Sequence, residues 1–112
     1  MKPIVIQNSK IPVYFSIFIN ISAITLFPFI ISRDEMSDVT IRHEKIHIEQ
    51  QRELLVIFFY ILYVWYWLAG KVKRMNNDEA YMNIPFEREA YEQMYDVNYL
   101  NTRQKHSWKN YL

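Results

Sequence analysis

Cysteine is absent from this sequence of 112 residues, and glycine occurs only once, at Gly70. The lack of cysteine excludes disulfide bonds and thiolate metal ligands, so a metal ion can be held only by His, Asp or Glu. With a single glycine, sharp backbone reversals are expected at Asn, Asp, Ser or Pro. The formal net charge of +1 provides no excess of positive charge that would attract nucleic acid, and no nucleic-acid partner is expected.

The length is that of one domain with a modest hydrophobic core, so residues 1–112 are expected to form a single domain. An apolar run covers residues 11–31, but no small-residue cleavage site follows it. We therefore expect no cleavable signal peptide.

The most informative motif is His-Glu-x-x-His, formed by His43, Glu44 and His47. On a helix, residues four positions apart leave the same face one turn apart, so the two imidazoles can bind one Zn²⁺. Glu44 follows the first histidine and lies within reach of a water molecule on the metal without being a ligand itself. This arrangement predicts a zinc site with Glu44 as the general base of a hydrolytic reaction.

A catalytic zinc ion usually has three protein ligands, so a third ligand has to come from elsewhere in the chain. Residues 85–95 are expected to form a helix, with Pro85 in its first turn and Asn83 as its N-cap. Glu87 shares a helix face with apolar residues (Ala90, Tyr91 and Met94), so it is expected to point inward. A buried carboxylate needs a cation, which makes Glu87 our candidate for the third ligand.

Two other residues are weaker candidates for this ligand. Glu89 shares its helix face with polar residues (Glu92, Gln93 and Asp96) and is expected to face water. His106 lies in the basic stretch of residues 103–109 and is expected to be a solvated residue of the tail.

The remaining pattern predicts a helix-rich α+β fold with short N-terminal strands. Residues 2–7 are expected to form a strand, and residues 23–31 an edge strand, because Pro28 cannot donate a ladder hydrogen bond. Between them, residues 13–19 form either a short helix or a strand, unless residues 11–31 span a membrane. A long central helix is expected over residues 39–68, capped by Ser37 or Asp38. Polar residues 75–79 would form a break between helices, and residues 80–83 would connect this break to the next helix. A further short helix is expected near residues 98–104.

The second half of the central helix, residues 54–69, is apolar on all sides. A helix of this length measures about 24 Å, which is short of the ~30 Å hydrocarbon core of a bilayer. It is rich in Tyr and Trp and is followed by Lys71, Lys73 and Arg74, a combination typical of a membrane boundary. We expect membrane contact through residues 54–74, by partial embedding rather than a full span. The protein would then be membrane-associated and otherwise intracellular; the alternative is a central helix buried by the rest of the chain.

The motif at His43, Glu44 and His47, followed by Glu87-Arg88-Glu89-Ala90, resembles the gluzincin branch of the zincin metallopeptidases, and most closely small, largely uncharacterised zincin-like proteins. In several gluzincins an Asp follows the alanine, whereas this chain has Tyr91 there. The resemblance implies a minimal zincin-like domain with His43, His47 and Glu87 as the zinc ligands. It also implies that an edge strand, here residues 25–31, aligns an extended peptide or protein substrate or binds a protein partner.

These observations predict a zinc-dependent metallopeptidase in which Glu44 deprotonates a zinc-activated water. Tyr91 could supply an additional oxyanion donor, but core packing is the role we expect for it. Two alternatives remain open. One is a zinc-stabilised structural or interaction protein with little or no catalytic activity, and the other is a small membrane protein in which the motif is incidental.

Overall fold

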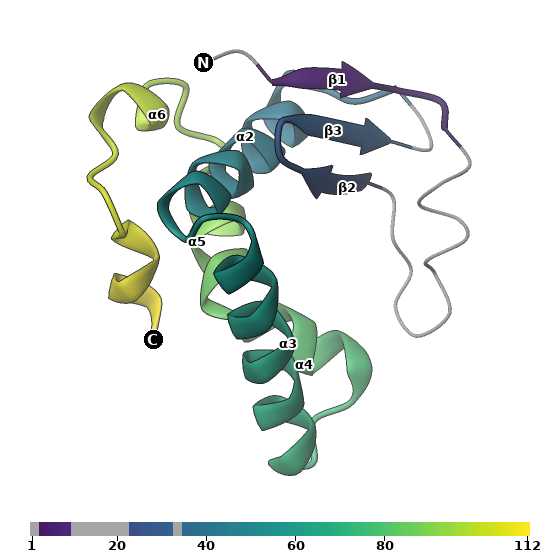
Figure 1. Cartoon of the computed structure of the whole chain (residues 1–112), viewed down its shortest axis with the longest axis vertical. Coiled ribbons are helices and arrows are strands. Elements are labelled where there is room, and N and C mark those ends of the chain that lie inside the picture. The colour runs from purple at the N-terminus through teal and green to yellow at the C-terminus, as the bar shows by residue number, and fades with distance from the viewer. Residues whose placement is uncertain (1–2, 10–22, 33–34) are drawn as a thin grey trace.

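A computed structural model describes residues 3–9, 23–32 and 35–112, and shows a helix-rich α+β fold in which a small sheet lies across one end of the helices (Figure 1). The strands are β1 (Ile4–Ile6), β2 (Ala23–Leu26) and β3 (Phe29–Ser32). The helices are α2 (Asp38–Glu53), α3 (Ile57–Val72), α4 (Asn77–Met82), α5 (Pro85–Gln93) and α6 (Tyr99–Thr102), followed by the 3₁₀ helix η1 (Ser107–Tyr111). The expected element over residues 13–19 lies outside the described residues.

The three strands form one sheet in the order β1-β3-β2. β1 pairs in parallel with β3, with Ile4 opposite Phe29, and β2 pairs antiparallel with β3, with Thr25 opposite Ile30. The prediction of one strand over residues 23–31 was wrong, because this segment is a hairpin that turns at Phe27 and Pro28. Pro28 therefore lies in the turn rather than within a strand. β2 is an edge strand of the described sheet, as expected.

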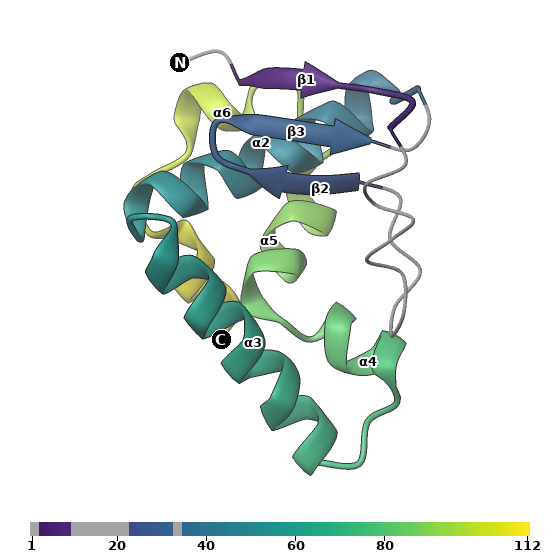
Figure 2. The ribbon, with the colours of Figure 1, turned by 45° about the vertical axis from the view of Figure 1, so that its right-hand side comes forward.

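Helix α2 begins where the sequence predicted. Ser37 is its N-cap, and the Ser37 hydroxyl accepts a hydrogen bond from the backbone N–H of Thr40 at 3.2 Å. The helix lies against β2 on one side and α5 on another, and it passes behind the sheet in Figure 2. Its buried side chains include Ile46 and Ile48 together with both histidines of the motif. The sheet and α5 thus meet on the same helix that carries the motif.

The expected continuous helix over residues 39–68 was also wrong, because α2 and α3 are separate helices bent by 113°. α2 ends in a Schellman motif, in which Val56 N–H bonds to Gln51 C=O and Leu55 N–H bonds to Arg52 C=O. Leu55 has φ 57° at the position that is usually glycine. The bend folds α3 back toward the metal-binding motif instead of extending α2 away from it.

The end of α3 repeats this geometry, with Arg74 at φ 68° and bonds from Arg74 N–H to Lys71 C=O and from Met75 N–H to Gly70 C=O. The sequence rule that reversals require Asn, Asp, Ser or Pro fails at both helix ends. The one glycine, Gly70, instead lies where α3 and α4 approach each other closely. A Cβ atom added there would lie 3.0 Å from Ala80 Cβ, so α4 packs directly on this part of α3.

The chain between α3 and α5 also differs from the prediction. Residues 76–83, expected as a polar break and a connection, contain α4, with Asn76 as its N-cap. Asn83 ends α4 instead of capping α5, and the N-cap of α5 is Ile84, with Pro85 in the first turn as expected. Near the C-terminus the short helix α6 and then η1 follow, and Trp108 of η1 packs on Phe86 of α5. This contact joins the C-terminal segment to α5.

Candidate metal centre

The three predicted ligands come together in the structure. One turn of α2 separates His43 from His47, and the first turn of α5 brings Glu87 between them. Glu87 Oε1 lies 3.1 Å from His43 Nε2 and 3.0 Å from His47 Nε2, and the two Nε2 atoms are 3.2 Å apart. Each of the three side chains is buried, with 5% of its residue surface exposed. The inward orientation of Glu87 agrees with the prediction from its helix face.

This donor set fits a metal ion. Among the described residues, His43, His47 and Glu87 form the one group whose ligand atoms all lie close enough to share an ion. Ligand atoms of a tetrahedral zinc site, at about 2.0–2.1 Å from the ion, are about 3.3 Å from one another. The distances of 3.0–3.2 Å observed here are close to that value. Two imidazoles and one carboxylate also match the ligand type of catalytic zinc sites.

The close approach of these side chains shifts the pKa values of His47 and Glu87. Burial by itself would lower the pKa of His47, but the Glu87 carboxylate and its hydrogen bond outweigh burial and raise that pKa to about 9. Burial likewise would raise the pKa of Glu87, but the neighbouring His47 and His43 lower it well below its ordinary value. Without a metal ion, His47 therefore holds a proton at neutral pH. A bound cation would take the place of that proton.

The orientation of His47 is set by a hydrogen-bonded chain. His47 Nδ1 donates to Gln50 Oε1 at 2.7 Å, which leaves Nε2 as the nitrogen that faces the other two ligand atoms. Gln50 Nε2 in turn donates to the Phe86 carbonyl at 3.1 Å and to Glu89 Oε1 at 2.9 Å. Gln50 is fully buried, so its bonds tie α2 to α5 in the interior.

Glu89 is the last residue of this series of hydrogen bonds, and the prediction that it faces water was wrong. It is fully buried and accepts hydrogen bonds from Arg103 Nε at 2.5 Å and from the Tyr99 hydroxyl at 2.6 Å. Arg103 also forms a bidentate pair with Glu53, at 2.8 and 3.1 Å. Glu89 is thus covered by the C-terminal segment, which periodicity within α5 alone could not reveal.

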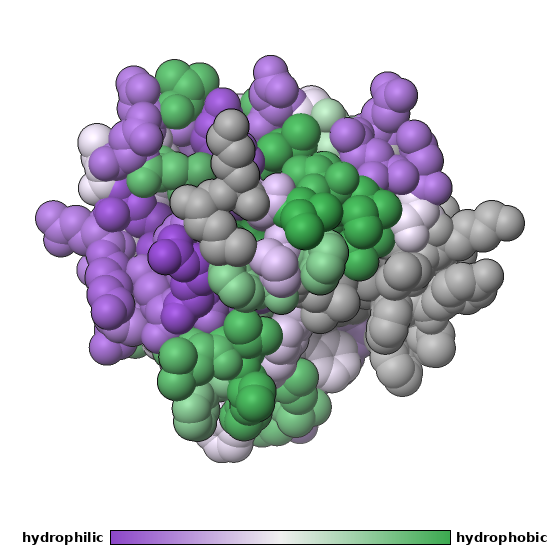
Figure 3. Space-filling model, turned by 45° about the horizontal axis from the view of Figure 1, so that its top comes forward, coloured by the Kyte–Doolittle hydropathy of each residue, from purple (hydrophilic) through white to green (hydrophobic). Residues whose placement is uncertain are grey.

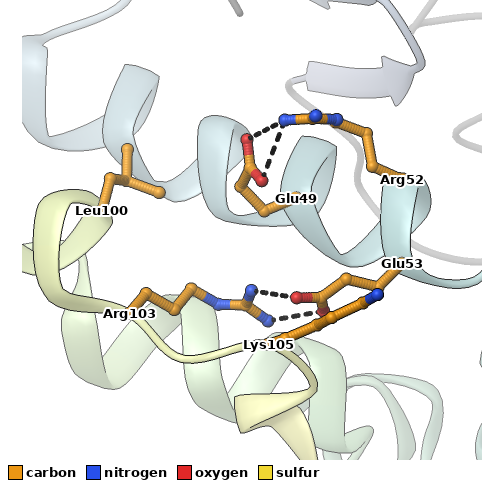
Figure 4. A pocket seen from close by; sticks show the side chains of 6 residues that line it. All are labelled: Glu49, Arg52, Glu53, Leu100, Arg103 and Lys105. Carbon is orange, nitrogen blue, oxygen red and sulfur yellow. Dashed lines mark hydrogen bonds and ion pairs between the residues drawn. The ribbon is translucent and has the colours of Figure 1, made fainter.

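Arg103 also lines a pocket of about 350 Å³ between α2 and the segment of residues 100–105 (Figure 4). Its other lining residues are Glu49, Arg52, Glu53, Leu100 and Lys105. None of the three candidate ligands lines it. Figure 4 shows the two ion pairs, Arg52 with Glu49 and Arg103 with Glu53, which neutralise most of the charge in its walls.

Tyr63 is a site residue that sequence reasoning missed. Its hydroxyl donates to Glu87 Oε2 at 2.6 Å, on the side of the carboxylate away from the histidines. Burial and the nearby Glu87 carboxylate raise the pKa of Tyr63 well above its ordinary value, so the hydroxyl keeps its proton and remains a donor. In the sequence, Tyr63 is only one of several aromatic residues of an apolar helix, and its contact with Glu87 depends on the bend between α2 and α3.

Glu44 is buried beside the ligands, and the Thr25 hydroxyl of β2 donates a hydrogen bond to Glu44 Oε2. A second link joins the same strand to the helices. Gln51 Nε2 donates to the Thr25 carbonyl at 2.8 Å, Gln51 Oε1 accepts from Phe27 N–H at 2.7 Å, and the Tyr60 hydroxyl also donates to the Thr25 carbonyl. β2 is thereby fixed next to α2, and its Thr25 orients Glu44.

The other residues considered from the sequence lie differently. The ring of Tyr91 packs on His43 at 4.3 Å between centroids, and its hydroxyl is 2.9 Å from that of Tyr81. His106 is half-buried rather than fully solvated, and it does not belong to the metal-binding group. It is the residue before η1 and has φ 62°.

Comparison of the chain with protein-family models, with curated proteins and with solved structures gave no match.

Proposed function

We propose that this chain is a zinc-dependent peptide hydrolase of the zincin type. The observation that carries the proposal is the convergence of Glu87 from α5 with His43 and His47 from α2, within 3.2 Å of one another. An incidental motif gives no reason for a carboxylate 40 residues further along the chain to meet both histidines. The buried Glu44, placed on the same helix next to the first histidine, supplies the base that such a reaction requires.

A zinc ion bound by the three ligands would lower the pKa of a water molecule and polarise the carbonyl of the substrate. Glu44 accepts the proton of the attacking water and transfers it to the nitrogen of the leaving amine. Thr25 holds Oε2 of Glu44, so we assign the proton transfer to Oε1. Tyr63 and Gln50 hold Glu87 and His47 in position through their outer atoms, which limits the reorganisation needed on binding.

We propose that an extended peptide substrate, or a protein partner, binds along β2, the edge strand nearest the site. The Gln51 side chain already bonds to the Thr25 carbonyl and to Phe27 N–H, as a neighbouring strand would. A peptide that pairs with this part of β2 therefore has to displace Gln51. This requirement favours substrates that bring their own amide groups to both positions.

A zinc-stabilised structural or interaction protein is the alternative, and the burial of the site favours it. Both histidines and Glu87 are 5% exposed, and Glu44 is 8% exposed, which is typical of a closed structural site. In that case zinc serves to join α2 to α5, and its binding free energy contributes to folding.

Metal analysis tests the site, and an activity assay separates the two functions. The purified protein should contain about one zinc per chain, and His43→Ala and His47→Ala should abolish binding, while His106→Ala should not. Zinc retained by the His47→Ala variant would refute the site. The zinc-loaded protein is then assayed against quenched fluorescent peptide libraries, together with Glu44→Gln and the matched control Glu49→Gln, a half-exposed residue of the same helix. If the protein is a hydrolase, Glu44→Gln should lose activity, while the unmodified protein and Glu49→Gln should both cleave peptides. If none of the three proteins cleaves peptides, or if all three cleave them equally, the hydrolase proposal is refuted and the structural role is supported.

A further inference from the structure

Helix α3 presents two different faces. The inner face carries Phe59, Tyr63, Tyr66 and Gly70, which recur at helical spacing and pack on α5 and α4. The outer face, which we call the α3 stripe, consists of seven large apolar residues that are each at least 48% exposed: Ile57, Phe58, Ile61, Val64, Trp65, Leu68 and Val72. At 100° per residue these seven positions all lie opposite the inner face.

The stripe is large and continuous for a protein surface. Figures 1 and 2 show α3 running away from the sheet, with α4 on its inner side, and Figure 3 shows hydrophobic surface gathered at the same lower end of the molecule. Single exposed apolar residues are common, but contiguous apolar surface along a whole helix marks a contact with another apolar phase. No charged residue occurs between Glu53 and Lys71, so no ionic group interrupts the stripe before its last residue, Val72.

The charges next to the stripe indicate what covers it. Lys71, Lys73 and Arg74, all exposed, follow directly at its C-terminal end, and Lys71 Nζ lies 5.8 Å from the centre of the Trp67 ring. The acidic pair Asp78 and Glu79 begins α4, which packs on Gly70 on the inner side of α3. A row of apolar side chains that ends in an aromatic and basic cluster matches the acyl and headgroup layers of an anionic bilayer surface.

The length of α3 defines how it would lie. Within the described part of the chain, no single helix is long and apolar enough to cross a membrane; only α2 and α3 together meet that criterion, and they are sharply bent. A helix of 16 residues measures about 24 Å and has one exposed apolar face, which suits a position parallel to the membrane plane.

We propose that the α3 stripe binds the surface of membranes that contain anionic lipids, with Lys71, Lys73 and Arg74 at the headgroups. The metal site would then be held next to the membrane, because Tyr63 on the inner face of the same helix bonds to Glu87. This proposal does not depend on hydrolytic activity, since it rests on the outer face of α3 alone.

The test is sedimentation of the full chain with vesicles of phosphatidylcholine alone or mixed with phosphatidylserine. The unmodified protein should bind the mixed vesicles, and added salt should weaken the binding. Ile61→Gln combined with Leu68→Gln should reduce binding at least tenfold, whereas the control pair Val97→Gln and Leu112→Gln, which is more exposed and lies outside α3, should not. All four sites are exposed, so neither variant should unfold the protein.

Lys71→Gln combined with Lys73→Gln tests the choice of anionic lipid. Each lysine near an anionic surface strengthens binding about fivefold, so this variant should bind about 30-fold more weakly, while Lys105→Gln with Lys109→Gln, of the same charge change, should not. Failure to bind either kind of vesicle, or equal loss in stripe and control variants, overturns the proposal. So does a detergent-free dimer that the Ile61 and Leu68 variant converts to a monomer, because the stripe would then be covered by a second copy.

Discussion

Tyr63 Oη donates to Glu87 Oε2 at 2.6 Å, while the other oxygen of the same carboxylate faces the two histidine nitrogens. The hydrogen bond joins α3 to α5 and directs Glu87 Oε1 toward His43 and His47. An aromatic residue of an apolar helix thus becomes part of the candidate metal centre, because the bend after α2 returns that helix to the site.

Removing this hydroxyl should weaken metal binding without loss of the fold. Tyr63→Phe keeps the ring contacts with Phe59 and Phe86 but leaves Glu87 Oε2 without its donor. Loss of such an outer partner typically weakens zinc binding about 10- to 100-fold. Competition with a chromophoric chelator measures the affinity. Tyr66→Phe, one turn away on the same inner face, is the control and should bind zinc as tightly as the unmodified protein.

Substitutions of Glu87 and Glu89 in α5 should have different effects on zinc binding and on stability. Glu87→Gln should lose zinc, because a ligand is removed. Glu89→Gln should still bind one zinc ion at saturation but lower the free energy of unfolding by about 3 kcal/mol, since the Arg103 side chain, 3% exposed, loses a charged partner.

Glu49→Gln is the matched control for Glu89→Gln. It breaks an ion pair with an exposed Arg52 and should change stability by no more than about 0.5 kcal/mol. Zinc content and urea unfolding of the three variants provide the measurements. Loss of zinc from Glu89→Gln with retention in Glu87→Gln would reverse the ligand assignment.

The metal-free protein should lose stability as the pH rises. The pKa of His47 is about 9 in the folded protein, against an ordinary value of 6.5, because Glu87 stabilises the protonated ring more than burial destabilises it. A raised pKa contributes stability that is fully present below pH 6.5 and is lost as the pH rises to about 9, on the order of 3 kcal/mol.

Urea unfolding of chelator-treated protein between pH 6 and 10 measures this effect. His47→Gln should abolish the decline over that range, and His106→Gln should preserve it. The zinc-loaded protein should behave in the opposite way, because protons compete with the metal for the same nitrogens, so its stability should fall as the pH is lowered. An unchanged decline in the His47 variant would show that another group titrates.

The sequence was sufficient to predict that His43, His47 and Glu87 come together, because the determinants of this group are local. The spacing of His43 and His47 sets their geometry on any helix, and the apolar neighbours of Glu87 on its own helix determine which carboxylate points inward. The Ser37 cap and β1 are equally local features, and they too agree with the structure.

The features that were missed depend on partners far along the chain. Glu89 lies on a polar helix face, so the pattern within α5 predicts that it is exposed. It is buried because the C-terminal segment brings Arg103 and Tyr99 over it. Tyr63 reaches Glu87 only because α3 folds back. That bend has no local signal, since leucine stands at the position where glycine usually ends a helix.

The Leu55 position therefore offers a test of how the bend is stabilised. Leu55 has φ 57° and is 72% exposed, so it adopts an unfavourable left-handed conformation without burying its side chain in return. Leu55→Gly should relieve this strain and raise the free energy of unfolding by about 1 kcal/mol. Ile61→Gly, at an exposed position inside α3, is the control and should lower it by about 1 kcal/mol, because glycine is unfavourable in a helix interior. Thermal and urea unfolding of both variants give the comparison. If the two glycines destabilised the protein equally, residue 55 would lie within a continuous helix, and the contact of Tyr63 with Glu87 would be lost with the bend.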